Sequence, residues 1–174
     1  MVDIDVCFCS DLQFLYPTLV AIKSLLINTG NTGIKIRINM IIPEKTTQKI
    51  QSKLDKYSFT KINNVTYNLI EFIPPLSLKN ILVKMDNHSE IQKLKCFNIA
   101  TNILNYSRFY LHKLLPSSDK ILYLDGDILI LGNIKSLYDT QFTNNCFFAA
   151  VNGYCDKSSY FNKQHPNVIN NINN

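Results

Sequence analysis

The stretch KILYLDGDILIL, residues 120–131, places two acidic side chains inside a run of hydrophobic residues. The hydrophobic residues reach Leu124, and Asp125 and Asp127 follow with a single glycine between them before hydrophobic residues resume. Near-continuous hydrophobic runs are typical of strands that are covered on both faces of a parallel sheet. Carboxylates in such a position need a physical reason, because burying an ionised group without a partner is costly.

Two explanations account for the pair. On an extended strand, side chains two residues apart point to the same side, so Asp125 and Asp127 can face one ligand. Two close carboxylates repel unless a cation lies between them or one takes up a proton, and Mg²⁺ and Mn²⁺ commonly bridge carboxylates to substrate phosphates. Alternatively, D-G-D is a turn sequence that would make the stretch a hairpin. The motif alone favours neither explanation.

The rest of the chain predicts strands that alternate with helices. We expect strands at 4–10, 34–44, 65–73, 121–124 and 146–154, and helices at 14–30, 46–58, 91–116 and, as a short helix or turn, 133–140. Residues 76–90 show little periodicity and are predicted to form a loop or lid. Connections of this length are too long for hairpins, so the pattern indicates an α/β domain with a mostly parallel sheet.

Composition narrows the function classes. The chain has 174 residues, of which 46% are hydrophobic, and a net charge of +5 carried almost wholly by lysine. This length predicts one globular domain. The lysines are scattered and there are only two arginines, Arg37 and Arg108, whereas nucleic-acid binding usually needs a clustered basic stripe. We therefore expect no nucleic-acid partner, although the mild positive charge would help to attract a nucleotide diphosphate.

Cysteine usage and hydropathy predict a cytoplasmic protein. The five cysteines include no C-x-x-C pair, which argues against both a disulfide framework and a zinc site and favours buried thiols in a reducing compartment. The start, MVDIDVCFC, carries acids where a secretory signal has basic residues. No hydrophobic run approaches the roughly 20 residues that span a bilayer.

Three segments, in order, resemble the glycosyltransferases of family 8, which include glycogenin and bacterial lipooligosaccharide galactosyltransferases. VCFCSDLQFLYPTLVAIKSLLINT resembles the family's first strand, nucleotide loop and following helix. NYSRFYLHKLLP resembles its Y-x-R-[FL] helix, and DKILYLDGDILILGNIKSLYD resembles its D-x-D segment. The resemblance implies a GT-A fold, a Rossmann-like α/β sheet that binds a nucleotide sugar and holds Mn²⁺ (or Mg²⁺) at the D-x-D motif.

The resemblance also implies roles for the first loop. Cys9, Ser10 and Asp11 stand where the family contacts uridine, with Asp11 as the expected partner of the uracil ring. Gln13 stands where the family often has an asparagine that touches the nucleotide. Phe14 replaces the usual tyrosine of this loop.

Further roles follow for the second half of the site. Arg108 matches the arginine that contacts the donor sugar or its phosphates, and we expect it to act in catalysis. Its alternative is a structural salt bridge to an acid such as Asp125; a lone arginine on an otherwise hydrophobic helix favours the functional role. Asp125 and Asp127 are the expected metal ligands, and Gly126 is expected to bring backbone close to the ribose.

The implied function is metal-dependent transfer of a hexose from a UDP-sugar, with retention at the anomeric carbon, to a saccharide, lipid or protein acceptor. We expect residues 1–155 to form an incomplete nucleotide-sugar-binding domain and the asparagine-rich residues 156–174 to form a polar tail. The motifs that we recognise end near Tyr154, and His165 does not match the family's late metal-binding histidine. A truncated, catalytically inactive module that binds nucleotide sugar or a partner is therefore the alternative function, and the sequence leaves a homodimer open.

A phosphatase of the haloacid dehalogenase type also places D-x-D at the end of a strand. That class carries its motif near the N-terminus and needs a downstream lysine and a paired acid. Here few residues follow Asp127, and their only acids are Asp139 and Asp156. We therefore reject this function.

Overall fold

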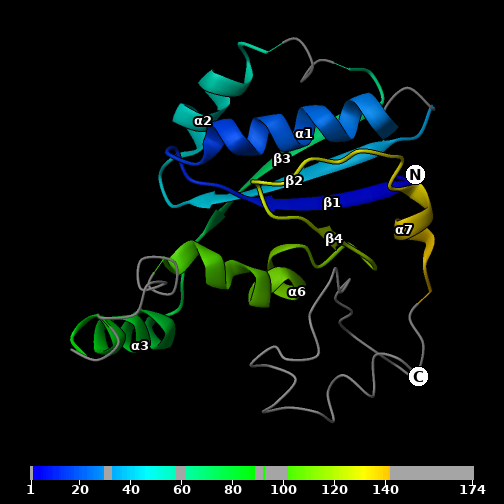
Figure 1. The fold of residues 1–174 in the computed structure, drawn as a ribbon. Helices are drawn as coiled ribbons and strands as arrows, with labels where there is room; N and C mark the ends of the chain where they lie inside the picture. The colour runs from blue at the N-terminus through cyan, green and yellow to red at the C-terminus, as the bar shows by residue number, and fades with distance from the viewer. Residues whose placement is uncertain (1, 30–32, 58–61, 89–91, 93–101, 142–174) are drawn as a thin grey trace. The chain divides into compact units, whose positions relative to one another are not determined.

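The computed structural model describes residues 2–29, 33–57, 62–88, 92 and 102–141. Residues 1–138 form one compact unit, which the description below concerns. Its four strands make a parallel sheet in the order β3-β2-β1-β4, with the bounds β1 Ile4–Cys9, β2 Ile36–Pro43, β3 Val65–Phe72 and β4 Leu122–Tyr123. The helices are α1 Leu15–Thr29, α2 Thr47–Leu54, α3 Leu76–Asp86, the 3-10 helix η3 Ile103–Tyr110, α6 Leu111–Leu114 and α7 Lys135–Asp139. The predicted α/β class with a parallel sheet is confirmed (Figure 1).

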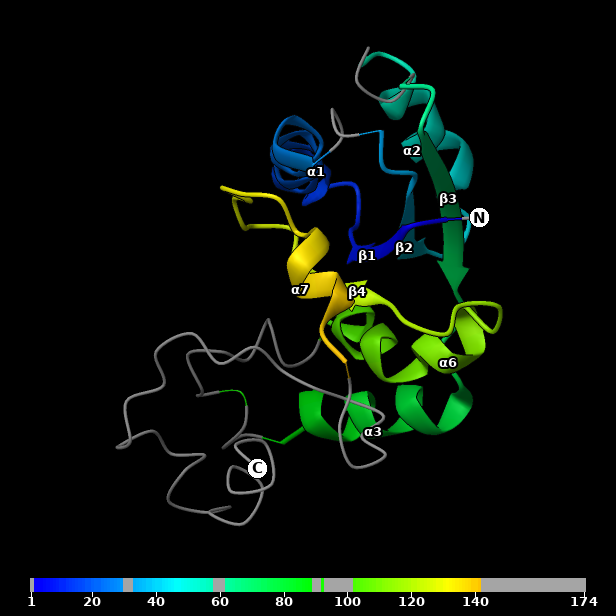
Figure 2. The same cartoon turned by 90° about the vertical axis from the view of Figure 1, so that its right-hand side faces the viewer.

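Alternation along the strands divides the hydrophobic core between the two faces of the sheet. Ile4, Val6 and Phe8 of β1 pack with the buried side of α1 and with α2. Cys7 points to the opposite face and packs with hydrophobic residues of α3 and η3. Figures 1 and 2 show α1 and α2 on one side of the sheet and α3 and α6 on the other. Helices on both faces explain why the strands are so hydrophobic.

The sequence of α1 favours a helix at this place. Leu15, Leu19, Ile22 and Leu26 recur at helical spacing and are all buried. Just before the helix, the Asp11 carboxylate accepts hydrogen bonds from the backbone N–H groups of Gln13 and Phe14, which satisfies donors that a helix start leaves unpaired. The helix therefore begins directly beyond the carboxyl end of β1.

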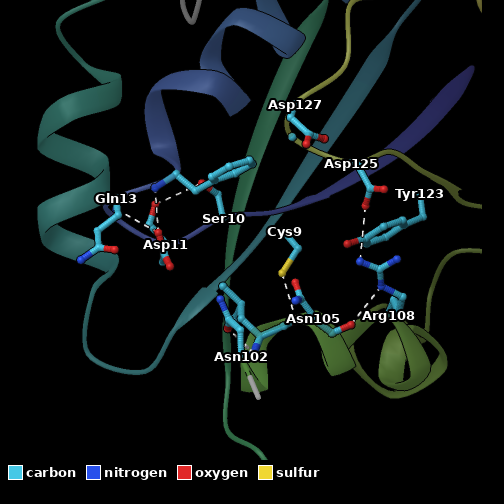
Figure 3. A pocket seen from close by; sticks show the side chains of 13 residues that line it. Cys9, Ser10, Asp11, Gln13, Asn102, Asn105, Arg108, Tyr123, Asp125 and Asp127 are labelled. Carbon is cyan, nitrogen blue, oxygen red and sulfur yellow. Dashed lines mark hydrogen bonds and ion pairs between the residues drawn. The ribbon is translucent and has the colours of Figure 1, made fainter. Parts of the chain in front are cut away.

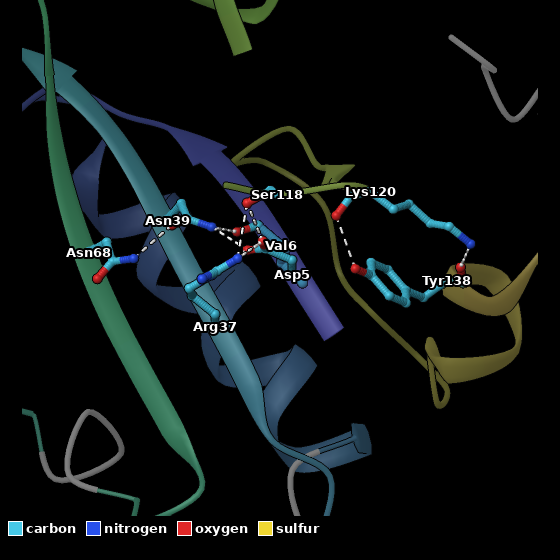
Figure 4. A network of polar contacts seen from close by, with 8 residues as sticks. All are labelled: Asp5, Val6, Arg37, Asn39, Asn68, Ser118, Lys120 and Tyr138. Carbon is cyan, nitrogen blue, oxygen red and sulfur yellow. Dashed lines mark hydrogen bonds and ion pairs between the residues drawn. The ribbon is translucent and has the colours of Figure 1, made fainter. Parts of the chain in front are cut away.

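The face of the sheet opposite α1 carries a buried polar network toward the amino ends of the strands (Figure 4). Asp5, only 3% exposed, accepts hydrogen bonds from Arg37, Asn39 and Ser118. Asn68 extends the network to β3 by donating to Asn39. Because Ser118 precedes β4, this network joins strands β1, β2 and β3 to the segment that leads into β4.

A second set of hydrogen bonds connects Lys120, just before β4, to α7. The Lys120 ammonium donates to the backbone oxygen of Tyr138 at 2.8 Å, and the Tyr138 hydroxyl donates to the backbone oxygen of Lys120 at 2.9 Å. The predicted short helix after the D-G-D stretch is thus present as α7, and it is bonded to that stretch.

The prediction of a loop or lid at 76–90 was wrong for most of that segment, because α3 covers Leu76–Asp86. Its hydrophobic residues Leu78, Leu82 and Met85 follow helical spacing and belong to the hydrophobic cluster that contains Cys7, on the face of the sheet opposite α1. Pro75 precedes the helix in an extended conformation, as is common at a helix start. The periodicity was present, but exposed hydrophobic residues such as Ile81 and Val83 obscured it.

Two other predictions need correction in their details. Within the predicted helix 91–116, residues 102–116 contain the 3-10 helix η3 followed by only the four α-helical residues of α6. The predicted strand 121–124 is reduced to the two residues of β4. The predicted fifth strand at 146–154 and the predicted polar tail at 156–174 lie outside the described residues.

No helix within the described residues is both long enough and hydrophobic enough to cross a membrane.

Candidate functional site

One pocket of about 430 Å³ lies beyond the carboxyl ends of the neighbouring strands β1 and β4 (Figure 3). Open α/β sheets bind ligands in this position. All of the site residues predicted from the sequence line it: Cys9, Ser10, Asp11, Gln13, Arg108, Asp125, Gly126 and Asp127. The first four come from β1 and the loop before α1, Arg108 comes from η3, and the last three follow β4.

The loop between β1 and α1 is held rigidly. Ser10 is buried, its backbone N–H donates to Ile41, and its hydroxyl donates to the backbone oxygen of Asp11. Thr18 of α1 donates to the Ser10 hydroxyl at 3.1 Å. Both backbone hydrogen bonds to the Asp11 carboxylate go to Oδ1, so this side chain is held in one orientation at the pocket wall. A fixed acceptor of this kind can recognise an N–H donor of a ligand.

Cys9 contributes a neutral thiol to the floor of the pocket. Its Sγ donates to the backbone oxygen of Leu104 at 3.1 Å and lies 3.3 Å from the Ser107 hydroxyl. Burial raises the pKa of the Cys9 thiol to about 11, although the Ser107 hydroxyl and the nearby Arg108 charge act in the opposite direction. The thiol is therefore protonated at neutral pH, which makes it a poor nucleophile and a poor metal ligand.

Arg108 is oriented by three neighbours. Its Nε donates to the backbone oxygen of Asn105 at 2.9 Å, and its guanidinium lies over the Tyr123 ring, 4.8 Å from the centroid. One terminal nitrogen lies 3.4 Å from Oδ1 of Asp125. The salt bridge to Asp125, which was considered above as the structural alternative to a catalytic role for Arg108, is therefore present. It is long and its partners are 38% and 56% exposed, so it contributes little stability by itself.

The D-G-D segment combines the two explanations considered for it. The backbone turns at Gly126 and Asp127, so it does not stay extended as the metal hypothesis assumed. Within the described residues β4 pairs with β1 alone, so the segment does not form a hairpin there. Asp125 and Asp127 nevertheless both line the pocket. A turn and a ligand site are compatible here.

The residues present fit a hard divalent cation shared with a ligand. In the described part of the chain, no cluster of three or more His, Cys, Asp or Glu side chains could hold a metal alone. Two carboxylates at the rim of an open pocket match the way Mg²⁺ is usually held, by one or two protein carboxylates together with substrate phosphates. The pocket volume leaves room for such a ligand.

Gly126 has a packing role that the sequence did not reveal. A Cβ atom built at this position would lie 2.4 Å from Oγ1 of Thr18 and 3.3 Å from the Phe14 ring. Thr18 is fully buried, and Oγ1 lies 3.1 Å from both the Ser10 hydroxyl and the backbone oxygen of Phe14, the two acceptors within reach of its single proton. The glycine therefore lets the D-G-D turn approach the first turn of α1, which brings the two walls of the pocket together.

Replacing Gly126 with alanine should lower the free energy of unfolding by about 1–3 kcal/mol, because the buried Thr18 cannot move away without losing hydrogen bonds. Gly132→Ala is the matched control, since a Cβ there meets no atom within 4 Å; its effect should stay within about 0.5 kcal/mol. Urea denaturation of both variants measures the difference. Equal stabilities would mean that the close contact is not a constraint, whereas removing Oγ1 with Thr18→Ala should make Gly126→Ala less harmful.

Five lining residues were not predicted to have a role: Phe14, Asn102, Leu104, Asn105 and Tyr123. Asn102 accepts a hydrogen bond from the backbone N–H of Leu104 at 3.0 Å and so caps η3. An asparagine before a helical segment is a recognisable capping signal. Tyr123 gives no such signal, because in the sequence it is one more large residue in a buried strand.

Comparison with known proteins yields a consistent set of relatives. The family model for glycosyl transferase family 8 matches residues 5–174, which continues past Tyr154, where the motifs recognised in the sequence end. Human glycosyltransferase 8 domain-containing protein 2 is 27% identical over 157 residues, which cover 90% of this chain and 40% of the human protein. The Xenopus tropicalis glycosyltransferase 8 domain-containing protein 1 is 30% identical over 122 residues, which cover 70% of this chain and 28% of that protein.

Solved structures show the same fold. The galactosyltransferase LgtC in complex with donor and acceptor sugar analogues has a TM-score of 0.53 at 22% identity, over 79% of this chain and 43% of LgtC. An active-site mutant of LgtC has a TM-score of 0.56 at 21% identity, over 79% of this chain and 42% of that chain. The chain thus spans about 40% of the length of the curated relatives that it matches first.

Proposed function

Because the chain belongs to glycosyl transferase family 8, we propose that it binds a UDP-sugar together with a divalent cation and transfers the hexose to an acceptor. The observation that carries this proposal is that the predicted site residues all line one pocket at the carboxyl ends of β1 and β4. A fixed carboxylate, an arginine and a pair of aspartates come to this pocket from three separate segments of the chain. These are the chemical groups that a base, a sugar diphosphate and a cation require.

In this proposal, each wall of the pocket binds a different part of the donor. Asp11, held by the backbone of the loop before α1, accepts the N–H of the uracil ring, and Cys9, Ser10 and Gln13 contact the uridine. Asp125 and Asp127 hold Mn²⁺ or Mg²⁺ against the diphosphate, with the backbone of Gly126 beside them. When bound, the cation supplies Lewis-acid stabilisation of the negative charge on the departing diphosphate.

Arg108 adds the protein's own positive charge at the reacting end of the donor. Its position between the Asn105 backbone and the Tyr123 ring leaves its terminal N–H groups beside Asp125, at the pocket. There it can donate to sugar hydroxyls or phosphate oxygens and stabilise the charge that develops as the sugar–phosphate bond breaks. We further propose retention at the anomeric carbon and a saccharide, lipid or protein as acceptor, as in the family that the sequence resembles.

The decisive experiment measures turnover by the full chain. Purified protein is incubated with UDP-glucose and with UDP-galactose, in Mn²⁺ and in EDTA, and release of UDP is followed. We expect Mn²⁺-dependent release from at least one donor. Donor binding without release would instead support a catalytically inactive nucleotide-sugar-binding module, and absence of binding would contradict both functions.

Arg108→Ala should weaken binding of the UDP-sugar about tenfold or more while leaving uridine affinity within about twofold, because the arginine serves the sugar diphosphate and not the base. Arg108→Lys keeps the charge but loses the fork of donors, so it should give an intermediate loss. Titration calorimetry measures the donor, and ligand-observed NMR measures uridine. Equal losses for the two ligands would identify Arg108 as a structural residue.

A further inference from the structure

Tyr123 is the one aromatic residue of β4, and its ring supports the guanidinium of Arg108 (Figure 3). The guanidinium carbon lies 4.8 Å from the ring centroid, within the range of a cation–π interaction. Tyr123 is itself firmly held. Its backbone pairs with Cys7 of the central strand β1, and its side chain packs on the hydrophobic cluster beneath the sheet. The ring is therefore a fixed surface against which the guanidinium of Arg108 lies.

The other contacts of Arg108 differ in how they respond to a bound donor. The hydrogen bond from Nε to the Asn105 backbone fixes one edge of the guanidinium. The contact with Asp125 is 3.4 Å long, and it engages the same carboxylate that the proposed function assigns to the cation. A cation on Asp125 competes with Arg108 for that carboxylate. In the loaded pocket the Tyr123 ring and the Asn105 carbonyl would then be the contacts that keep Arg108 in place.

We propose that Tyr123 is a positioning residue for the donor: the Arg108 guanidinium lies over its ring, which keeps the terminal N–H groups toward the sugar diphosphate when Asp125 is engaged by the cation. This inference rests on the proposed function. It assigns the effect to the π face of the ring, not to the hydroxyl.

Two substitutions separate the ring from the hydroxyl. Tyr123→Phe keeps the aromatic face and should leave UDP-sugar affinity within about twofold of the wild type. Tyr123→Leu keeps a hydrophobic side chain on the cluster but removes the face; it should weaken UDP-sugar binding about threefold to tenfold and uridine binding much less. Arg108→Ala and the double variant Tyr123→Leu/Arg108→Ala complete a cycle, in which the double variant should bind no more weakly than Arg108→Ala alone.

The measurement is calorimetric titration of the full chain with UDP-glucose and UDP-galactose in Mn²⁺, with uridine titrated separately and thermal unfolding recorded for each variant. A smaller loss in Tyr123→Phe than in Tyr123→Leu, confined to the UDP-sugar and absent when Arg108 is already replaced, supports the inference. Losses that are equal for both ligands, or that add to those of Arg108→Ala, overturn it and make Tyr123 a structural residue. If the wild-type chain binds neither UDP-sugar in Mn²⁺, the proposed function fails first and this inference falls with it.

Discussion

Asp127→Asn should abolish the manganese-dependent part of UDP binding, a loss of at least about 100-fold in affinity. Replacing a residue that contacts a metal ligand commonly lowers metal affinity or activity about 10- to 100-fold. Replacing a ligand itself should therefore cost at least as much. The substitution preserves the size of the side chain but removes its charge. Asp127 is exposed and lines the pocket at a turn, so removing its charge should leave the fold intact.

The matched control is Asp86→Asn, which removes a carboxylate from the exposed end of α3, outside the pocket. It should leave both UDP affinity and the Mn²⁺ dependence unchanged. Calorimetric titrations with UDP, in Mn²⁺ and in EDTA, compare the two variants at equal thermal stability. If Asp127→Asn binds UDP as tightly as the wild type in Mn²⁺, the metal assignment is wrong.

Asp5→Leu should lower the free energy of unfolding by about 2–4 kcal/mol, since it leaves Asn39 and Ser118 without their acceptor and the partly exposed Arg37 without its counter-charge. Asp5 is 3% exposed, and its two carboxylate oxygens together accept from Arg37, Asn39 and Ser118. Replacement of Arg37 by methionine in the Asp5→Leu background should recover part of the loss, because the uncompensated charge of Arg37, whose side chain is 25% exposed, is then removed as well.

Glu44→Gln is the control for this prediction, because Glu44 is 41% exposed and its contact with Lys45 is 3.5 Å long. An exposed pair of this kind contributes about 1 kcal/mol or less. Urea denaturation measures both variants. A loss below about 1 kcal/mol for Asp5→Leu would show that the network does not hold the amino ends of the strands and the segment before β4 together.

Local patterns were sufficient to predict most of the fold. Hydrophobic spacing identified β1, α1, β2, α2 and β3, because each has a clear period and ends near a proline, glycine or polar residue. It failed at α3, whose exposed face carries Ile81 and Val83 and so hides the helical pattern. Along β2, Arg37 and Asn39 alternate with hydrophobic residues. This pattern does not reveal that both polar side chains donate hydrogen bonds to the buried Asp5.

The candidate site was likewise predictable only in part: its residues could be identified from the sequence, but the contacts between them could not. Every residue proposed from the motifs lies at one pocket: two of the motifs mark the carboxyl ends of the adjacent parallel strands β1 and β4, and the third supplies Arg108 from η3. The contacts that organise these residues could not be predicted, because they join segments that are distant in sequence. Two examples are the contact of the Tyr123 ring with Arg108 and the contact of Thr18 with Gly126. Both depend on how closely the elements pack, which residue spacing and composition do not reveal.

The most direct test of the central claim, that Asp125 and Asp127 share a divalent cation with a nucleotide diphosphate, is calorimetric titration of the wild-type chain with UDP in Mn²⁺ and again in EDTA. We expect binding in Mn²⁺ that becomes at least about 100-fold weaker when the cation is removed, the same loss as is expected for Asp127→Asn. The same affinity under both conditions, or no binding under either, would contradict the claim.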